Sequence, residues 1–548
     1  MHSVTLNPSI LPISLTFPEV NLPAVLPADS EALKALLLTQ QQAHEATIKS
    51  IERQVCDYIN TLVEQFILSR HRMFGSSSEQ QSAQARLFDE AECLAAGSSE
   101  AQDITPIPVP ATPVASKPEV KARGKRAPLP AELPRVEIVH DVPEAERTCA
   151  CGTPMVVIGQ AISEQLDIVP MQIRVRRHIR NTYGCPTSLH APITAPFPPQ
   201  PLPKSNASPD FLAMLLTVKF VDGQPLTRFN KVLNRHGAQV PVQTLARWVI
   251  GTAEGVLQPL LNVMRDALFD GRFIHMDETV VQVLKEIDKR PTSNSYMWVQ
   301  VGGPPGKPVV IYDYDPSRSG AVPARLLQGY QGYLMTDGYE GYNKLVSAER
   351  ITHLVCWAHV RRRFVEATLV QPKGKKGLAD QAVAMIGKLY GVERQHKEAD
   401  DAERLMARQS ESVPILAELR EWLTRTQPAV TPQSALGRAL SYMHQYWDKL
   451  TRYTECGDLP IDNNRCENAI RPFVIGRKAW LFSDTPAGAN ASAIIYSMVE
   501  TAKANGLDPY AWLRRILRDL PAAKTVEEVE ALLPWNLHGM DLISEIVS

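Results

Sequence analysis

Two proline-rich segments divide this chain into parts that must fold separately. Residues 75–135 open with GSSSEQQSAQ and carry eight prolines between positions 106 and 134, and a second run, APITAPFPPQPLP, covers residues 191–203. Such composition buries too little apolar surface to offset the entropy lost on ordering. We therefore predict a disordered linker and a hinge within a multidomain chain of 548 residues.

The remaining parts follow from hydrophobic periodicity and from turn residues. In chain order we predict an N-terminal tail (1–29), a long helix (30–74), the linker (75–135), a cysteine-bearing module (136–191), the hinge (192–209), a helical region (210–265), an α/β part (266–372), a helical insertion (373–455), a second α/β part (456–508) and a C-terminal helical tail (509–548).

The helix predicted over residues 30–74 has a seam of apolar side chains. Ile48, Ile51, Val55, Tyr58 and Leu62 alternate by three and four residues, as a coiled-coil heptad requires. The seam is imperfect towards its N-terminal side. Two interpretations stay open: a self-associating coiled coil, and an amphipathic helix packed on its own domain.

The helical region contains two consecutive helix patterns. PLTRFNKVLNRHG ends at Gly237, as a helix C-terminus does, and TLARWVIGTAEGVL begins a second helix after VPVQ. The pair is typical of a helix-turn-helix, in which Arg247 is a candidate DNA contact. A plain helical hairpin is the alternative.

Bulk composition places few limits on the partner. A net charge of −1 leaves local basic patches free to bind nucleic acid. The first twenty residues lack a basic start and are broken by proline, unlike a signal peptide, and no apolar run reaches the ~20 residues of a membrane helix. The close cysteines Cys149, Cys151 and Cys185 suit a metal site in a reducing compartment. We predict a cytoplasmic protein without a membrane partner.

The α/β parts carry three carboxylates at places where they can converge. FIHM, SYMWVQV, PVVIYDY, YLMTDGY and THLVCW are β-rich, which predicts a mixed α/β sheet, and residues 461–505 read as helix–strand–helix. We expect Asp277 to end the strand FIHM and Asp337 to end the strand YLMT. Glu467 lies in DNNRCENAIRPF, in a helix that Asn463 or Asn464 can cap. Carboxylates that hold two divalent metals ~3.5–4 Å apart support phosphodiester cleavage.

Spacing alone is weak evidence for these three residues. The chain has 59 acidic residues, and several others could take any of the roles: Asp313, Asp315, Glu340 and Glu500. Neighbouring cations and tyrosines support the interpretation of these acids as metal ligands in nucleic-acid chemistry, because cations can bind phosphates beside the metals that the acids hold. They are Tyr339, Tyr342, Arg361, Arg362, Arg363, Arg471, Arg477 and Lys478.

The longest motifs resemble one known family. HMDETVVQVL, YLMTDGYEGY, HLVCWAHVRRRF, IDNNRCENAIRPFVIGRKAWLF and YSMVETAKANGLDPYAWL are similar to the insertion-sequence sixty-six (IS-sixty-six) bacterial DDE transposases, over nearly the whole chain. The resemblance implies a ribonuclease-H-like catalytic domain built from both α/β parts. Its Asp-Asp-Glu triad falls on Asp277 (in MDET), Asp337 (in TDGY) and Glu467 (in NNRCEN). Asp277 would bridge two Mg²⁺ or Mn²⁺ ions, and Asp337 and Glu467 would each hold one.

The resemblance also implies the reaction and the partners. Hydrolysis at an element end frees a 3′ hydroxyl, which then attacks target DNA, so double-stranded DNA is the substrate. We predict phosphate contacts from the cations around the triad and in the helical region, which are Arg471, Arg477, Lys478, Arg361, Arg362 and Arg247. A nucleoid-associated homo-oligomer is expected, with small accessory proteins of the same element as further partners.

The cysteine module departs from the family pattern of two cysteine pairs. Cys149 and Cys151 are more tightly spaced than CxxC, and Ser188 follows Cys185 where a cysteine is expected. His190 can serve as a fourth ligand, because structural zinc takes four nitrogen or sulfur ligands. A Cys₃His zinc site and a decayed site that folds without metal both stay open.

One further motif matches the family, and one further residue departs from it. Cys356 and His359, in CWAH, match a family signature, but two ligands are too few for zinc, so we predict a structural role. Ala479 stands where the family usually has asparagine, so a DNA contact is missing there. Rival functions are a silenced DNA-binding protein that occupies element ends and a metal-dependent repair nuclease.

Overall fold

The computed structural model describes eight ranges of the chain: 2–5, 14–17, 29–74, 172–183, 193–194, 196–344, 351–371 and 376–537. The chain forms two compact units, one of residues 1–97, 195–235 and 239–548, and a smaller one of 98–194 and 236–238. In the smaller unit β3 (Thr182–Tyr183) pairs antiparallel with β4 (Ile193–Thr194). In the larger unit β1 (His2–Thr5) pairs antiparallel with β2 (Ser14–Phe17).

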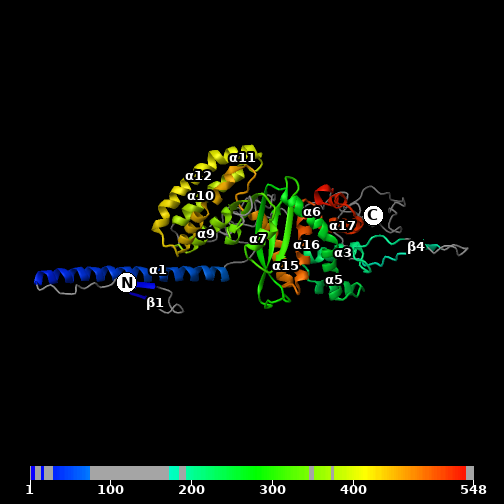
Figure 1. Ribbon diagram of the computed structural model, residues 1–548, viewed down its shortest axis with the longest axis horizontal. Coiled ribbons are helices and arrows are strands. Elements are labelled where there is room, and N and C mark those ends of the chain that lie inside the picture. Colours follow the sequence, from blue (N-terminus) through cyan, green and yellow to red (C-terminus); the bar gives the residue numbers. More distant parts are fainter. Residues whose placement is uncertain are drawn as a thin grey trace, which may run out of the picture. The chain divides into compact units, whose positions relative to one another are not determined.

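A five-stranded mixed sheet forms the centre of the larger unit (Figure 1). Its strands are β5 (Phe273–Gln282), β6 (Asn294–Gly302), β7 (Val309–Asp315), β8 (Gly332–Thr336) and β9 (Ile351–Val355). The order is β7-β6-β5-β8-β9. β6 is antiparallel to β5 and β7, whereas β8 is parallel to β5 and β9. The predicted mixed α/β sheet is confirmed, but Asp277 lies within β5, because pairing with β6 continues to Gln282.

The edge strand β7 is covered by helix α16 (Pro486–Ala504). The hydroxyl of Thr501 accepts from Val310 N at 3.0 Å and donates to Val310 O at 2.9 Å, and Ser497 accepts from Tyr312 N at 2.8 Å. Side-chain hydroxyls thus take the place of a further strand and satisfy backbone hydrogen-bonding groups of the edge strand β7.

The sequence pattern predicts a strand between α15 (Asn464–Trp480) and α16, and this prediction is wrong. Among the described residues, the β-pairing of this intervening segment is a single isolated bridge between Ser483 and Val283. Leu481, with φ +68, ends α15, and Thr485 caps α16 by accepting from Gly488 N. The chain therefore turns directly from one helix into the next.

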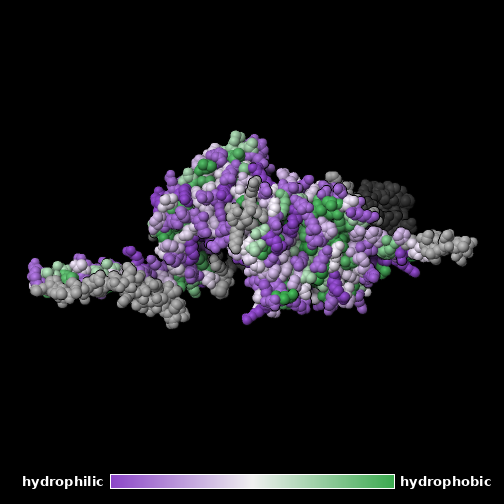
Figure 2. Space-filling view, in the orientation of Figure 1, coloured by the Kyte–Doolittle hydropathy of each residue, from purple (hydrophilic) through white to green (hydrophobic). Residues whose placement is uncertain are grey.

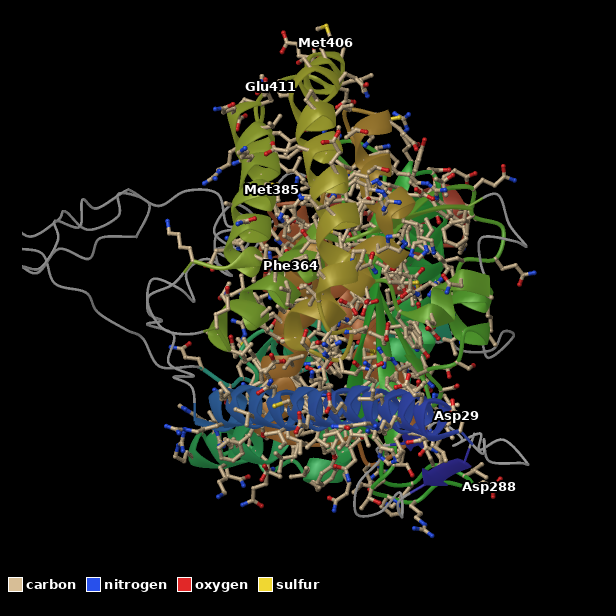
Figure 3. All side chains as sticks on the ribbon, turned by 90° about the vertical axis from the view of Figure 1, so that its left-hand side faces the viewer. Asp29, Asp288, Phe364, Met385, Met406 and Glu411 are labelled. Atoms are coloured by element: carbon tan, nitrogen blue, oxygen red, sulfur yellow. The ribbon has the colours of Figure 1, made fainter. Side chains whose placement is uncertain are left out.

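A helical bundle separates β9 from α15. Its helices are α9 (Trp357–Leu369), α10 (Leu378–Gln395), α11 (Asp401–Ala407), η4 (Arg408–Ser412), α12 (Val413–Thr426), η5 (Gln427–Ala429), α13 (Ala435–Gln445), α14 (Trp447–Thr451) and η6 (Arg452–Glu455). Phe364 and Met385 lie among the helices, whereas Met406 and Glu411 lie at one end (Figure 3). Apolar side chains of α9, α10, α12 and α13 form its core.

The helices that precede the sheet in the chain include the pair predicted as a helix-turn-helix or a helical hairpin. They are α3 (Pro209–Phe220), α4 (Leu226–Arg235), α5 (Val242–Thr252), η2 (Ala253–Leu257) and α6 (Gln258–Phe269). Gly237, with φ +82, lies in the turn after α4, which agrees with the predicted helix end. Asp210 of α3 accepts from Arg514 at 2.5 Å.

Short helices complete the larger unit. They are α7 (Ala321–Leu326), η3 (Glu340–Lys344), α17 (Pro509–Asp519), η7 (Leu520–Ala522), α18 (Val526–Glu530) and η8 (Pro534–Asn536). Arg514 belongs to α17, so the ion pair with Asp210 links the C-terminal helices to α3.

The long helix α1 (Ser30–Phe74) agrees with the helix predicted from these residues. Three seam residues are well exposed: Ile48 at 52%, Val55 at 37% and Leu62 at 46%. Figure 2 shows hydrophobic residues among polar ones along α1. Leu68, near its C-terminal end, is buried. In the described ranges, helices that are long enough to span a bilayer lack the necessary apolar character.

Candidate active site

Strand register brings Asp277 and Asp337 side by side. β5 and β8 run parallel, with His275 opposite Met335 as their last pair. Asp277 lies two residues after His275 and Asp337 two residues after Met335, so both carboxylates follow the same register and point to the same side. The sheet therefore sets the separation of the first two candidate ligands.

Each aspartate has one oxygen fixed by the backbone. Oδ1 of Asp277 accepts from Glu278 N, and Oδ1 of Asp337 accepts from Tyr339 N, both at 2.8 Å. Within the described part of the chain, the Oδ2 atoms accept no hydrogen bond. A carboxylate with one anchored and one open oxygen is oriented to bind a cation.

Electrostatics couples the aspartates to Glu467. Burial raises the pKa of Asp277 well above its usual range, and the charges of Asp337, Glu278 and Glu467 raise it further. Carboxylates that repel one another in this way are stabilised when a cation lies between them. The donor set of three carboxylates suits the hard ions Mg²⁺ and Mn²⁺.

Glu467 lies in the first turn of α15, and its two oxygens have different surroundings. Oε2 accepts from Arg362 Nη2 at 3.2 Å. Oε1 lies 3.7 Å from His359 Nδ1, which is too long for a hydrogen bond. Both of these facing atoms are buried without a hydrogen-bond partner in the described structure. Arg362, predicted as a phosphate contact, thus already pairs with the glutamate.

Asn463 occupies the N-cap position of α15, but its side chain does not cap the helix. Asn463 Nδ2 donates to Met276 O at 3.2 Å, and Oδ1 lies 3.0 Å from His275 Nδ1. Burial lowers the pKa of His275 to about 3, so the neutral ring donates to this oxygen. The asparagine therefore ties the start of α15 to β5 rather than satisfying the helix end.

A fourth carboxylate, Glu278, adjoins the three predicted ones. Its side chain is only 2% exposed. Its oxygens accept from Arg318 Nε at 2.6 Å and from Tyr342 OH at 2.8 Å. The Arg318 guanidinium also lies 4.2 Å from the Tyr339 ring centroid. Glu278 stands directly after Asp277 in MDET, but nothing in the sequence indicates its distant partner Arg318.

Two tyrosines hold the loop that carries Asp337. Tyr442 lies in α13, and Tyr446 is the residue directly after this helix. Tyr442 OH donates to Asp337 O, and Tyr446 OH donates to Gly338 O at 2.7 Å. Gly338 has φ +85, in the left-handed region that favours glycine, and a Cβ there would lie 2.8 Å from Tyr442 OH. The helical insertion thus helps to position an acid on the sheet.

We expect Gly338→Ala to displace the Asp337 loop, because backbone strain and a steric contact act together. The variant should lose about 1–3 kcal/mol of stability, which thermal unfolding measures. Gly306→Ala is the matched control, since φ is +77 there and no atom lies within 4 Å of the added Cβ. Equal effects in both variants would contradict the steric argument.

The predicted phosphate contacts lie on three helices. Glu467, Arg471 and Lys478 fall on one face of α15 by helical spacing, with Arg477 to its side. Arg471 and Lys478 are exposed. Arg361 and Arg362 belong to α9. Arg247 is exposed on α5, where its Nε donates to Gln243 O at 3.4 Å. α15 therefore carries a candidate metal ligand and candidate phosphate contacts together.

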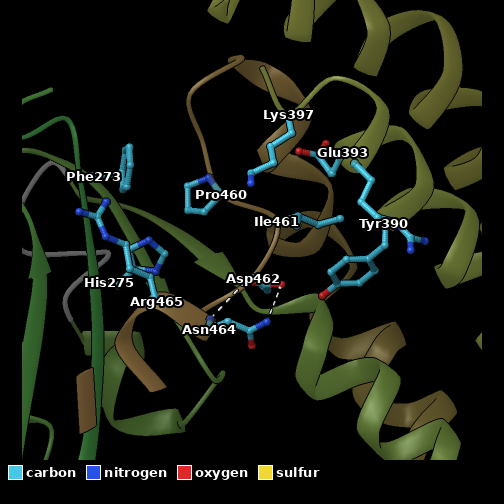
Figure 4. Close-up of a pocket in the computed structure, with 11 residues that line it drawn as sticks. Phe273, His275, Tyr390, Glu393, Lys397, Pro460, Ile461, Asp462, Asn464 and Arg465 are labelled. Atoms are coloured by element: carbon cyan, nitrogen blue, oxygen red, sulfur yellow. Dashed lines mark hydrogen bonds between the residues drawn. The ribbon is translucent and has the colours of Figure 1, made fainter. Parts of the chain in front are cut away.

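A pocket of about 300 Å³ adjoins these elements (Figure 4). Phe273 and His275 of β5 line one side, on the strand face that also carries Asp277. Asn464 and Arg465, just before Glu467, line another side, and α10 closes the third. Asn464 donates through its backbone and its side chain to Asp462. Asp277 and Glu467 thus belong to β5 and α15, two of the elements that line this pocket.

The candidate zinc ligands lie outside the described residues. These are Cys149, Cys151, Cys185 and His190. The predicted linker, 75–135, also lies there, as does most of the cysteine module.

Comparison with protein families gives four matches. Residues 204–491 match the model described as Transposase IS66 family, and 497–535 match the IS66 C-terminal element. Residues 146–187 match the zinc-finger binding domain of transposase IS66. Residues 61–138 match a model described as Transposase C of IS166 homeodomain. The matches include all three candidate acids and the three module cysteines, but not His190.

Curated relatives come from Sinorhizobium fredii (strain NBRC 101917 / NGR234). The uncharacterized protein y4qI is 28% identical over 94% of this chain and 98% of its own length. The uncharacterized protein y4jD is 29% identical over 79% of this chain and 88% of its own length. The uncharacterized protein y4hP is 29% identical over 76% of this chain and 77% of its own length. The chain is thus similar to proteins of comparable extent.

Proposed function

The chain belongs to the Transposase IS66 family, and we propose that it cuts DNA at element ends and joins the freed ends to target DNA. We further propose that Asp277, Asp337 and Glu467 hold two divalent metal ions for both steps. The observation that carries this proposal is the shared register of Asp277 and Asp337, with the Glu467 charge acting on the same site.

A ribonuclease-H-like catalytic domain is part of the proposal. The sheet order β7-β6-β5-β8-β9, with three antiparallel strands followed by two parallel ones, supports it. In this arrangement the first acid lies on the central strand β5, the second follows its parallel neighbour β8, and the third comes from α15. The helical bundle is then an insertion between the second and third acids.

Mg²⁺ or Mn²⁺, when bound, would neutralise the developing charge on the attacking and leaving oxygens. The open oxygens of Asp277 and Asp337 would hold the ions, and the backbone bonds at Oδ1 keep these carboxylates in place. In the first step water attacks phosphorus and the bond to the 3′ oxygen breaks, leaving a 3′ hydroxyl. In the second step this hydroxyl attacks target phosphorus and displaces another 3′ oxygen.

DNA is the proposed partner, as the zinc-finger and homeodomain family matches support. We assign phosphate contacts to cations on the active-site face and on α5: Arg471, Arg477, Lys478, Arg361, Arg362 and Arg247. Such contacts position the backbone without reading sequence. For Arg362 the contact with phosphate would require release from Glu467.

Labelled element-end DNA incubated with the protein and Mg²⁺ tests the function. Joined products support transposition. Cut products without joining support a nuclease, and a shifted band without cutting supports a silent DNA-binding protein. Ca²⁺ in place of Mg²⁺ should allow binding but not cutting, since the larger ion accepts geometries that do not align the attack.

We propose one structural zinc ion in the cysteine module. The match to the zinc-finger binding domain over residues 146–187 supports it and includes Cys149, Cys151 and Cys185. His190, three residues beyond the match, is the proposed fourth ligand, because structural zinc takes four nitrogen or sulfur ligands.

Self-association through α1 is also proposed, with a second copy of this chain as the partner. The exposure of Ile48, Val55 and Leu62 at heptad spacing supports it, because two copies of this seam would cover each other. Such pairing would bring two element ends together.

Ile51→Lys with Val55→Lys should abolish this pairing, because charges in an apolar seam lose hydration. Light scattering should show the mass falling to about half that of the wild-type chain, the ratio of a monomer to a twofold-symmetric dimer. The control is Ser50→Lys with Asp57→Lys, which adds charge on the outward side of the heptad. An unchanged mass in the seam variant would return α1 to the role of an ordinary amphipathic helix.

A further inference from the structure

The CWAH motif offers two metal ligands, and the structure adds a third. Cys356 Sγ, a ring nitrogen of His359 and a carboxylate oxygen of Glu467 lie within 4.8 Å of one another. Cys356 is the N-cap residue of α9 and His359 lies in the first turn, while Glu467 comes from α15, more than a hundred residues later. The objection that two ligands are too few for zinc therefore no longer holds.

The spacing of the histidine and glutamate ligand atoms suits a tetrahedral metal site. His359 Nδ1 and Glu467 Oε1 are 3.7 Å apart, close to the roughly 3.4 Å that separates ligands about 2.0–2.1 Å from a tetrahedral zinc ion. Both atoms are buried and lack a hydrogen-bond partner in the described structure. Facing polar atoms without partners point to a missing group between them.

The surroundings distinguish the ligand atoms. Arg362 donates to Glu467 Oε2 and leaves Oε1 directed at the histidine. Asn463 N donates to Cys356 Sγ at 3.1 Å, which fixes the position of the sulfur. The histidine and glutamate side chains are 20% and 22% exposed, so the cluster lies close to the protein surface although its ligand atoms are buried.

We propose that Cys356, His359 and Glu467 form a binding site for a soft divalent cation such as Zn²⁺, which has only Glu467 in common with the two-metal site. Thiolate and imidazole ligands select zinc over magnesium. Binding releases the thiol proton to solvent. The site shares Glu467 with the proposed Mg²⁺ site and differs from it in its thiolate and imidazole ligands.

Co²⁺ is the probe, because its bonds to thiolates absorb light and it takes the tetrahedral geometry of zinc. The parent protein is the full chain with Cys149→Ser, Cys151→Ser and Cys185→Ser, which removes the thiolates of the cysteine module. About one Co²⁺ per chain of the parent should show thiolate absorption, and any Co²⁺ held by carboxylates alone adds none. Cys356→Ser should remove this absorption, and His359→Gln should weaken binding by about tenfold or more.

Cys466→Ser is the matched control, since Cys466 is also buried but its Sγ contacts Val299 O instead. It should leave the absorption unchanged, and circular dichroism should show that each variant is folded. In the parent itself, Zn²⁺ should displace Co²⁺ while excess Mg²⁺ should not. Full absorption in Cys356→Ser, no absorption in the parent, or displacement by Mg²⁺ would each overturn the proposal. No step uses DNA, so failure here leaves the proposed function untouched.

Discussion

Glu467→Gln is expected to lower DNA cleavage and joining by about a hundredfold or more. Loss of an outer partner of a metal ligand already costs about 10–100-fold, and glutamine removes a ligand's charge outright. DNA binding should persist, because cations elsewhere contact the phosphates. Cleavage of labelled element ends with Mg²⁺, together with a gel-shift measurement on the same variant, separates the two effects.

Glu340→Gln is the matched control for this variant. Glu340 is exposed and lies three residues after Asp337, so its amide should leave cleavage within about tenfold, a barrier change near 1.4 kcal/mol. Asp277→Asn and Asp337→Asn should lose as much activity as Glu467→Gln. Wild-type cleavage by all three triad variants would refute the proposed mechanism.

The sequence predicts the sheet well because its signal is local. β-rich runs such as SYMWVQV and PVVIYDY are buried strands whose residues prefer extended backbone. The motif YLMTDGY predicts that Asp337 follows a strand, as it does after β8. Helix α1 also follows from its own periodicity. Each of these features depends on residues that are neighbours in the chain.

The features that the sequence misses depend on distant residues. The sequence predicts that Asp277 ends its strand, but pairing with β6 carries β5 onward. It also predicts that Asn463 or Asn464 caps α15, but Asn463 holds the N-cap position and its side chain bonds to β5 instead. Likewise nothing near Glu467 in the sequence indicates Arg362 or His359 as its neighbours. Tertiary contacts decide these positions, and one sequence does not record them.

Arg408→Ala is expected to lower the free energy of unfolding of the helical bundle by about 3–5 kcal/mol, the cost of leaving a buried charge unpaired. Arg408 is 2% exposed. It donates to both carboxylate oxygens of Glu393, at 2.8 and 2.6 Å, and to Tyr453 O at 2.8 Å. The arginine therefore joins η4 to α10 and to η6. Urea unfolding followed by tryptophan fluorescence measures the loss, since Trp422 and Trp447 lie in this bundle.

Two controls show whether the unpaired charge causes the loss. Lys388→Ala removes an exposed pair with Glu418, whose side chains are 56% and 59% exposed, and should cost at most about 1 kcal/mol. Arg408→Met combined with Glu393→Gln removes both charges and keeps much of the volume, so it should be more stable than Arg408→Ala alone. If the double variant is the less stable of the two, the arginine acts through its bonds to backbone carbonyls and not through Glu393. Because α13 holds the Asp337 loop through Tyr442, a loosened bundle should also reduce cleavage.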